Sequence, residues 1–406
     1  MATALFENRM LSMVERRLKD VKAPVNLRLW TGQTLAPPAP SPVTVTVRSP
    51  QALVHLANPS LGRLAKSYVE GEIDVEGNFR EVLQVSEQLV ADDHSVYQPR
   101  SHLWKWWRHS KSADRRNIQR HYDVGNDFYA LWLDRNRVYS CAYFKNPDDS
   151  LDAAQEQKLD HICHKLMLKP GERLLDIGCG WGGLVLWAVR NYGVKALGIT
   201  LSEEQHRYAT DRIRELGLSD RCEIRLQDYR DVPEDEPFDK ISSVGMFEHV
   251  GERNLPTYFG KINRLLKPGG LVMNHGITTS SLGSASLGSG IGDFVEEYVF
   301  PGGELMHVST VMEHMARQDL EVWDAECLRP HYAKTLWHWV DRLTARQDEA
   351  RALVGEKKLR TWLIYMAGSA HGFSRGWMSI YQLLGVKALP GGASPYPLTR
   401  NHMYEA

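Results

Sequence analysis

The sequence predicts an α/β protein in which a mostly parallel sheet carries helices on both faces and follows a small mixed α/β domain. Two observations support this prediction. From Glu172 onward, short apolar runs alternate with helical patterns, which is typical of the strand-helix-strand units of a parallel sheet. Before about residue 100, two short alternating runs lie close together in the sequence and helical patterns follow them.

The N-terminal part begins with two predicted strands. VNLRLW, from Val25, and VTVTV, from Val43, both alternate and flank the proline-rich turn APPAPSP. They therefore predict a paired strand unit. Residues 60–90 predict a helix, a turn and a second helix, because Gly71 and Gly77 break an otherwise helical pattern.

The segment HLWKWWRHSKSADRRNIQR, residues 102–120, interleaves tryptophans with basic side chains. Indole rings prefer the interfacial region of a bilayer and cations prefer anionic lipid, so this composition favours peripheral membrane contact. The alternative is a solvated linker whose tryptophans pack on the main domain. No segment of the sequence is long and apolar enough to span a bilayer, so any contact with lipid is expected at the surface.

The parallel sheet is expected to contain five strands in chain order. They are RLLDIG, VKALGIT, CEIRLQ, FDKISSVG and GGLVMNHGI, beginning at Arg173, Val194, Cys222, Phe238 and Gly269. A helix from Trp181, one over 202–217 and one ending near Leu266 separate them. Further helical patterns at 331–343 and 359–384 are expected to cover the sheet, and the tail from Gly385 is rich in turn residues.

The stretch TTSSLGSASLGSGIG, residues 278–292, interrupts this alternation. Its small residues cannot build a core, which predicts a mobile loop at the carboxyl end of a strand, where open α/β sheets bind ligands. The loop is expected to be either a lid or a tolerated insertion.

The glycine turn LLDIGCGWGG indicates an adenosine cofactor. Its glycines also satisfy the G-x-G-x-x-G pattern of nicotinamide enzymes, but that pattern alone is weak evidence. A nicotinamide enzyme usually places an acidic residue at the end of the second strand, and here that strand ends in Gly198-Ile199-Thr200. Asp176, two residues before Gly178, instead gives D-x-G-x-G-x-G, which favours S-adenosylmethionine.

Six ordered motifs make the resemblance specific. They are HYDVGNDFYALWLD from His121, YSCAYF from Tyr139, LLDIGCGWGG, GITLSEEQ, QDYRD from Gln227 and VGMFEHVG from Val244. Together they resemble the cyclopropane-fatty-acyl-phospholipid synthase family, which includes mycolic acid cyclopropane synthases and fatty-acid methyltransferases. The resemblance implies a Rossmann-like class I methyltransferase sheet. It also implies an accessory domain at 1–100, the basic and aromatic linker at 101–120, an S-adenosylmethionine-dependent catalytic domain at 121–390 and a tail at 391–406.

The resemblance further implies that a methylene group is transferred to the cis double bond of an unsaturated phospholipid acyl chain, with bound bicarbonate as the base. It assigns the bicarbonate site to Cys141, Glu248, His275, Tyr332 and the backbone of Ile277. The residue types suit this ion, because His275 and Tyr332 can donate to its oxygens and Glu248 can accept its hydroxyl. Alone, each residue could equally be a structural one.

The same resemblance assigns the cofactor contacts. They are Tyr139, Ser140, Asp176, Gly178, Cys179, Gly180, Gly182, Thr200, Gln205, Asp228 and Tyr229. Two alternatives on the same scaffold stay open: C-methylation of an unsaturated lipid, which gives a methyl branch, and N-methylation of a small amine. A lipid-binding protein without activity is a third, which the complete set of bicarbonate residues disfavours.

The composition of the sequence limits which binding partners and which cellular compartment are expected. The formal net charge of -1 argues against coating by nucleic acid. The five cysteines are dispersed without a C-x-x-C pair, which favours reduced thiols over disulfides and predicts no metal site. The N-terminal segment also lacks the continuous apolar core of a signal peptide. We therefore expect a cytoplasmic protein at the inner face of the membrane; a homodimer stays open.

Overall fold

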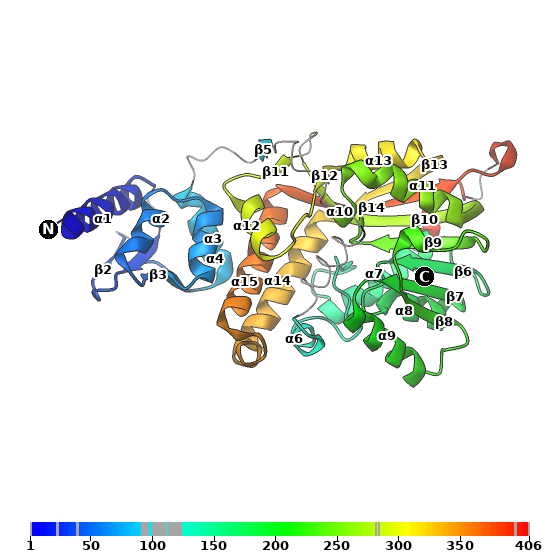
Figure 1. Ribbon diagram of the computed structural model, residues 1–406, viewed down its shortest axis with the longest axis horizontal. Helices are drawn as coiled ribbons and strands as arrows, with labels where there is room; N and C mark the ends of the chain where they lie inside the picture. The colour runs from blue at the N-terminus through cyan, green and yellow to red at the C-terminus, as the bar shows by residue number, and fades with distance from the viewer. Residues whose placement is uncertain are drawn as a thin grey trace. The chain divides into compact units, whose positions relative to one another are not determined.

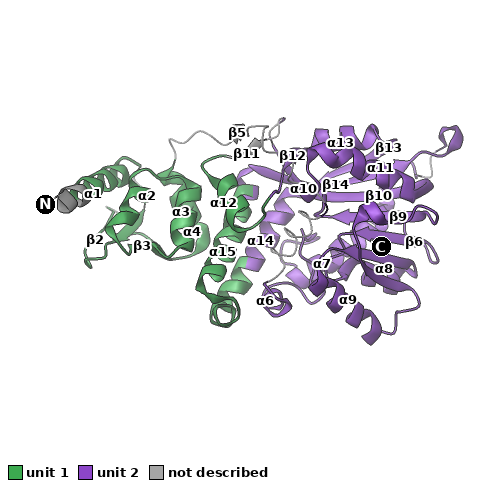
Figure 2. Cartoon of the chain, viewed as in Figure 1, with its two compact units in different colours: residues 1–100, 286–301, 340–372 green, residues 101–285, 302–339, 373–406 purple. Residues whose placement is uncertain are grey.

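The computed structural model describes residues 2–21, 24–37, 40–90, 97–99, 111, 124–280, 282, 285–393 and 396–404. They belong to two compact units (Figure 2). Unit 1 consists of residues 1–100, 286–301 and 340–372, and unit 2 of residues 101–285, 302–339 and 373–406. Each unit therefore joins segments that are far apart in the sequence.

Unit 1 contains a small sheet with the strand order β2-β1-β3-β4. Its strands are β1 (Val25–Arg28), β2 (Thr34–Leu35), β3 (Val43–Val47) and β4 (Ile73–Glu76). The predicted pairing of the first two runs is confirmed, and β1 and β3 are parallel. Its helices are α1 (Ala2–Val21), α2 (Leu53–Ala57), α3 (Leu61–Val69), α4 (Phe79–Leu89) and α12 (Ile291–Tyr298), and the short β5 (Tyr97–Pro99) follows α4.

The predicted turn between the two helices of residues 60–90 is wrong, because strand β4 separates α3 from α4. Ile73 and Val75 alternate with acidic residues and pair with Val47 and Val45 of β3. A strand pattern of four residues is too short to be recognised between two helical patterns. The conformation of this segment is determined by its pairing with β3, which the sequence does not reveal.

The segment 278–292 is not the uninterrupted loop that was predicted. Strand β10 extends into it, β11 (Ala285–Leu287) lies within it, and α12 begins at Ile291. Its small residues allow two backbones to meet: the Gly62 N–H donates to Ser289 O at 2.9 Å, and a Cβ on Gly62 would lie 2.1 Å from Gly290 O. The lid interpretation stays a prediction.

Unit 2 is built on a large sheet with the strand order β13-β14-β10-β9-β6-β7-β8, and β12 pairs with the end of β10 (Figure 1). The strands are β6 (Arg173–Ile177), β7 (Lys195–Thr200), β8 (Cys222–Leu226), β9 (Phe238–Val244), β10 (Leu266–Thr279), β12 (Met306–His307), β13 (Leu320–Cys327) and β14 (Met378–Lys387). The run from β10 to β8 is parallel, as predicted. Strand β14 is antiparallel to both of its neighbours.

The prediction of one helical pattern over 359–384 is wrong in its second half. Helix α15 (Gln347–Arg375) ends before Gly376, which has a positive φ of 74°, and strand β14 follows. The first tail residues, from Gly385, also belong to this strand. MSIYQLLGVK is buried on both faces, so it lacks the alternation that identifies a half-buried strand. Strand β13 was not predicted.

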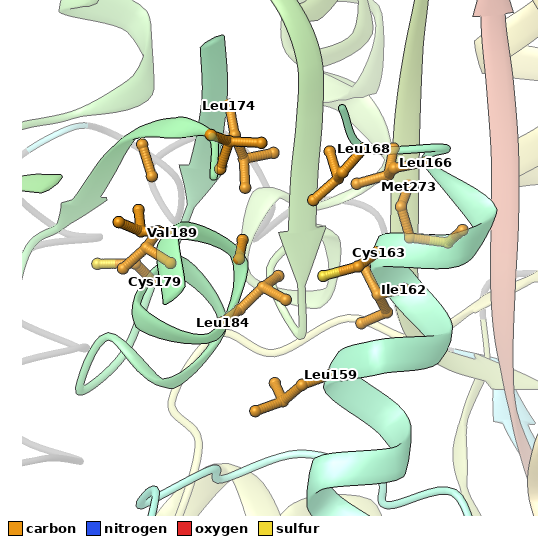
Figure 3. Packing of buried hydrophobic residues seen from close by; sticks show 14 of the residues in the cluster. Leu159, Ile162, Cys163, Leu166, Leu168, Leu174, Cys179, Leu184, Val189 and Met273 are labelled. Atoms are coloured by element: carbon orange, nitrogen blue, oxygen red, sulfur yellow. The ribbon is translucent and has the colours of Figure 1, made fainter. Parts of the chain in front are cut away.

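Helices cover both faces of the sheet. One face packs against α7 (Leu151–Lys165), α8 (Gly183–Tyr192), α9 (Glu203–Glu215) and α16 (Asn401–Tyr404). The other packs against α10 (Phe247–Val250), α11 (Leu255–Leu265) and α13 (Val308–Ala316). Neighbouring strand residues divide between the two cores: Leu174 joins the α7 face, shown in Figure 3, and Leu175 joins the α11 face.

The remaining helices are α6 (Asn126–Ala130) in unit 2 and α14 (Arg329–Ala345), which, like α15, contributes to both units. Short 3-10 turns are η1 (Pro50–Ala52), η3 (Tyr229–Asp231), η4 (Glu252–Asn254) and η5 (Pro390–Gly392). Within the described part of the chain, no helix combines the length and the apolar composition needed to cross a bilayer.

Candidate active site

A pocket opens where β6, β7, β8 and β9 reach their carboxyl ends. The predicted cofactor residues Tyr139, Ser140, Asp176, Gly178, Cys179, Gly180, Thr200, Gln205, Asp228 and Tyr229 all line it. Gly182 does not; it is the N-cap of α8 at a φ of 85°, and a Cβ there would lie 3.2 Å from Ala209. Gly182 therefore shapes the turn rather than the pocket wall.

The glycine turn builds its part of the pocket from backbone. Gly178 and Gly180 have φ values of 80° and 55°, which other residues adopt only with strain. Among the described residues, a Cβ on Gly180 would meet no atom within 4 Å, so nothing in this part of the chain fills the space beside it. Beneath the turn, the buried Asp176 carboxylate accepts a hydrogen bond from Ser242 Oγ at 2.7 Å. Burial raises the pKa of Asp176 to about 6.

Hydrogen bonds fix the polar groups on the other walls. Thr200 Oγ1 donates to Gln205 Oε1 at 2.8 Å, which orients the amide at the start of α9. The Asp228 carboxylate accepts from the Arg230 guanidinium at 2.7 and 2.8 Å. Hydrogen bonds from Arg230 hold the pKa of Asp228 below its usual value, although burial opposes them. Asp228 therefore presents a carboxylate to the pocket.

Lys158 is a pocket residue that the sequence did not reveal. Its ammonium is buried and donates to Ser140 Oγ at 2.9 Å. Burial lowers the pKa of Lys158 to about 8. It belongs to a buried polar face of α7 that also carries Gln155, His161 and Lys165. Polar residues are spread around α7 instead of being confined to one side. The periodicity of its sequence therefore does not distinguish this buried face from an exposed one.

None of the five predicted catalytic residues lines the cofactor pocket, and they fall into two groups. In the first group, Glu248 Oε1 accepts the backbone N–H of Ile277 at 2.6 Å. Burial raises the pKa of Glu248 to about 7. Gly276 makes room for this contact, because a Cβ on Gly276 would lie 2.2 Å from the Phe247 ring. The Ile277 N–H thus serves to hold Glu248.

His275 lies two residues before Ile277 on β10 and is fully buried. Its Nδ1 is 3.2 Å from the side-chain nitrogen of Gln382 on β14. Burial holds the pKa of His275 well below its ordinary value, so the ring is neutral. Among the described residues, neither His275 Nε2 nor Glu248 Oε2 has a hydrogen-bond partner, although both are buried. Buried polar atoms are normally satisfied, so each of these two atoms could hold a polar group of a ligand.

The second group contains Cys141 and Tyr332. The buried thiol of Cys141 donates to Ala142 O at 3.2 Å and to Leu328 O at 3.8 Å. The backbone N–H of Tyr332 donates to the same Leu328 carbonyl at 3.0 Å. Burial raises the pKa of Cys141, which keeps the thiol neutral.

Strand β14 connects the two groups. The Leu328 N–H donates to Ile380 O at 2.9 Å, and Ile380 lies opposite Ile277 in the β10–β14 register. Backbone hydrogen bonds thus link the Leu328 carbonyl, which Cys141 and Tyr332 share, to the paired ends of β10 and β14.

The open sheet, with β14 inserted beside β10 and a glycine turn at the edge of its pocket, defines the class: the protein is an S-adenosylmethionine-dependent methyltransferase with the class I fold. The family model described as mycolic acid cyclopropane synthetase matches residues 109–383. The chain belongs to this family.

Two curated relatives and one solved structure illustrate the range of the family. A "Probable fatty acid methyltransferase" of Pseudomonas putida is 44% identical over 401 residues, covering 97% of this chain and 100% of the relative. The cyclopropane-fatty-acyl-phospholipid synthase of Escherichia coli K12 is 38% identical over 276 residues, covering 67% and 68%. The crystal structure of mycolic acid cyclopropane synthase CmaA1, complexed with SAH and CTAB, shares 34% identity at a TM-score of 0.64, covering 67% of this chain and 98% of that chain.

Proposed function

We propose that the protein transfers a methylene group from S-adenosylmethionine to the cis double bond of an unsaturated phospholipid acyl chain and closes a cyclopropane ring, with bound bicarbonate as the general base. Two buried atoms, Glu248 Oε2 and His275 Nε2, have no hydrogen-bond partner among the described residues, and they carry this proposal. A base site that combines an acceptor with a donor suits bicarbonate, which has a hydroxyl and two further oxygens.

S-adenosylmethionine would supply an electrophilic methyl group. An alkene is a weak nucleophile, so the main task of the residues around the pocket is to hold the reacting carbons in line. Attack of the alkene on the methyl carbon would break the carbon–sulfur bond, release S-adenosylhomocysteine and leave a positive charge on the acyl chain. Loss of a proton from the added carbon to the base would then close the ring.

Bicarbonate would supply the base for that proton. The Glu248 carboxylate would accept the hydrogen bond of its hydroxyl, and His275 Nε2 and the Tyr332 hydroxyl would donate to its other oxygens. Cys141 would contribute a neutral thiol donor, and Ile277 would keep Glu248 in place through the 2.6 Å bond from its N–H.

Methyl-branch formation is the second candidate, and the Pseudomonas putida relative, a "Probable fatty acid methyltransferase", favours it. The two reactions share every step up to the charged acyl chain. If the proton then leaves a neighbouring carbon of that chain, the product is a methyl-branched alkene instead of a ring. The placement of the base therefore decides between the products.

We also propose that the protein meets its substrate at the inner face of the membrane through residues 104–120. This segment lies outside the described residues except for Lys111, whose Nζ lies 2.5 Å from an Asp231 carboxylate oxygen. Sedimentation with anionic vesicles should weaken as salt rises and when Trp106 and Trp107 become alanine. Binding that resists both changes would contradict the proposal.

The reaction is tested by incubating the purified protein with methyl-labelled S-adenosylmethionine and vesicles of monounsaturated phospholipid. Mass spectrometry of the released fatty acids distinguishes a labelled ring, a labelled branch and no label. Removing carbonate from the buffer should slow ring formation, and adding it back should restore the rate. Saturated phospholipid is the control substrate. A labelled branch, or turnover that does not depend on carbonate, would overturn the proposal of ring formation with bicarbonate as the base.

A further inference from the structure

Three side chains form a row across the antiparallel half of the sheet. His275 of β10 lies directly opposite Gln382 of β14, and Gln382 lies directly opposite Glu326 of β13. Directly opposed residues in antiparallel strands share one face of a sheet. Met273 and Leu384, each two residues away, belong to the core under α7, so the row faces that helix.

The charged groups around this row belong to α7 and β13. Glu326 accepts from His161 at 2.7 Å and pairs with Lys165 at 2.6 Å. Burial lowers the pKa of His275, and the nearby charges of Lys158 and Lys165 lower it further, while Glu326 opposes them. The His275 ring is therefore neutral and carries a single proton, on either Nδ1 or Nε2.

The hydrogen bond from Gln382 determines which nitrogen carries that proton. The Gln382 side-chain nitrogen is 3.2 Å from His275 Nδ1. An amide nitrogen is a donor and never an acceptor, so Nδ1 must accept and must be unprotonated. The proton then lies on Nε2, the atom that has no partner among the described residues.

We propose that Gln382 is a positioning residue that fixes His275 as the Nε2–H tautomer, so that the ring can donate a hydrogen bond from Nε2 to the proposed base. The inference rests on the proposed function in one respect, because the recipient of that bond would be bicarbonate. The opposite tautomer would present a lone pair to an anion and repel it. In active sites, the tautomer of a functional histidine is commonly set by another residue that hydrogen-bonds to one of its ring nitrogens.

The tautomer can be measured without any turnover. Ring ¹⁵N shifts of the histidine-labelled protein separate protonated from unprotonated nitrogens, and His275→Asn identifies the signal by its loss. We expect the Nε2–H form in the wild type. The Nδ1–H form, which a reversed Gln382 amide would give, overturns the proposal whether or not bicarbonate is the base.

Gln382→Met tests the cause. It keeps the length of the side chain but removes the donor, so the Nδ1–H form should become detectable. The bicarbonate concentration for half-maximal activity should rise about fivefold, as expected for the loss of one hydrogen bond. Leu384→Met is the matched control, since it places the same side chain on the same face of β14 and should change neither quantity. Binding of S-adenosylhomocysteine confirms that both variants are folded.

The two measurements separate the two proposals. A tautomer that stays Nε2–H in Gln382→Met overturns the positioning role of Gln382. The expected tautomers in both proteins, together with turnover that is independent of carbonate, support the positioning role and overturn the bicarbonate function.

Discussion

The cofactor pocket and the base site differ in what they are made of. The pocket takes its shape from the backbone of contiguous segments, such as the turn at Gly178 and Gly180, on the parallel half of the sheet. The proposed base site draws on single side chains from distant segments, including Glu248, which the Ile277 N–H holds, and His275, on the strand that pairs with β14. A site of the first kind is encoded in a local motif, whereas one of the second kind exists only after folding.

This difference predicts that catalysis and cofactor binding can be lost separately. Glu248→Gln should lower turnover by about 10²–10⁴-fold, the usual range for general-base assistance, because an amide cannot replace the charge-assisted bond to the base. Calorimetry should show S-adenosylhomocysteine binding as in the wild type. Parallel loss of both would show that the two regions are one functional unit.

The same substitution should stabilise the protein at high pH. Burial raises the pKa of Glu248 from 4.5 to about 7, so between these values the unfolded chain has lost a proton that the folded chain keeps. Stability from this group therefore falls as pH rises through that window. The advantage of Glu248→Gln over the wild type should be greater at pH 8 than at pH 5, by on the order of 3 kcal/mol.

Urea unfolding at the two pH values measures this difference. Glu321→Gln, at an exposed position of β13, is the matched control. If the pH dependence of the wild type and of Glu248→Gln is the same, Glu248 is not buried as described.

On the cofactor side, Gly180→Val should weaken S-adenosylhomocysteine binding by about 10–100-fold. A branched side chain would occupy the pocket, and the φ of 55° adds strain of about 1–2 kcal/mol. Gly217→Val controls for the strain, because Gly217 has a φ of 66°, equally open surroundings and no place in the pocket lining. Equal effects of the two variants would assign the loss to strain alone.

The smallest effect is expected for Cys141→Ser. The thiol is neutral and only donates weak bonds, so a hydroxyl can replace it with a loss of about two- to tenfold in turnover. The control is Cys163→Ser, on α7 itself and in the apolar core between this helix and the sheet, which should cost stability without changing the dependence on carbonate. A complete loss of turnover in Cys141→Ser would assign the thiol a direct chemical role.

The sequence correctly predicts the parallel half of the large sheet, where local patterns determine the structure. The strands from Arg173 to Ile277 were placed because each is a short apolar run bounded by turn residues. The glycine turn located the pocket because positive φ values restrict those positions to glycine. The base-site residues came from the resemblance to a family, since nothing near Glu248 in the sequence indicates its contact with Ile277.

The remaining features depend on contacts between distant segments. Met378–Lys387 is buried on both faces and shows no strand periodicity, so the sequence predicts helix up to Leu384 and a turn-rich tail after it instead of one strand. The buried polar face of α7 was invisible because Lys158 and Lys165 find their partners only on other elements. Gln382 was missed for the same reason: its neighbours His275 and Glu326 are set by sheet register.

The position of β14 also has a consequence for synthesis on the ribosome. Strands β6 to β10 emerge first, but the edge of β10 that faces β14 has no partner until Met378–Lys387 have been translated, because β13 joins the described sheet only through β14. The nascent chain must therefore expose one unpaired edge of the apolar strand β10 late in translation, a state prone to association with other chains. A premature stop codon before Met378 would leave that edge permanently open and would delete Gln382 with it.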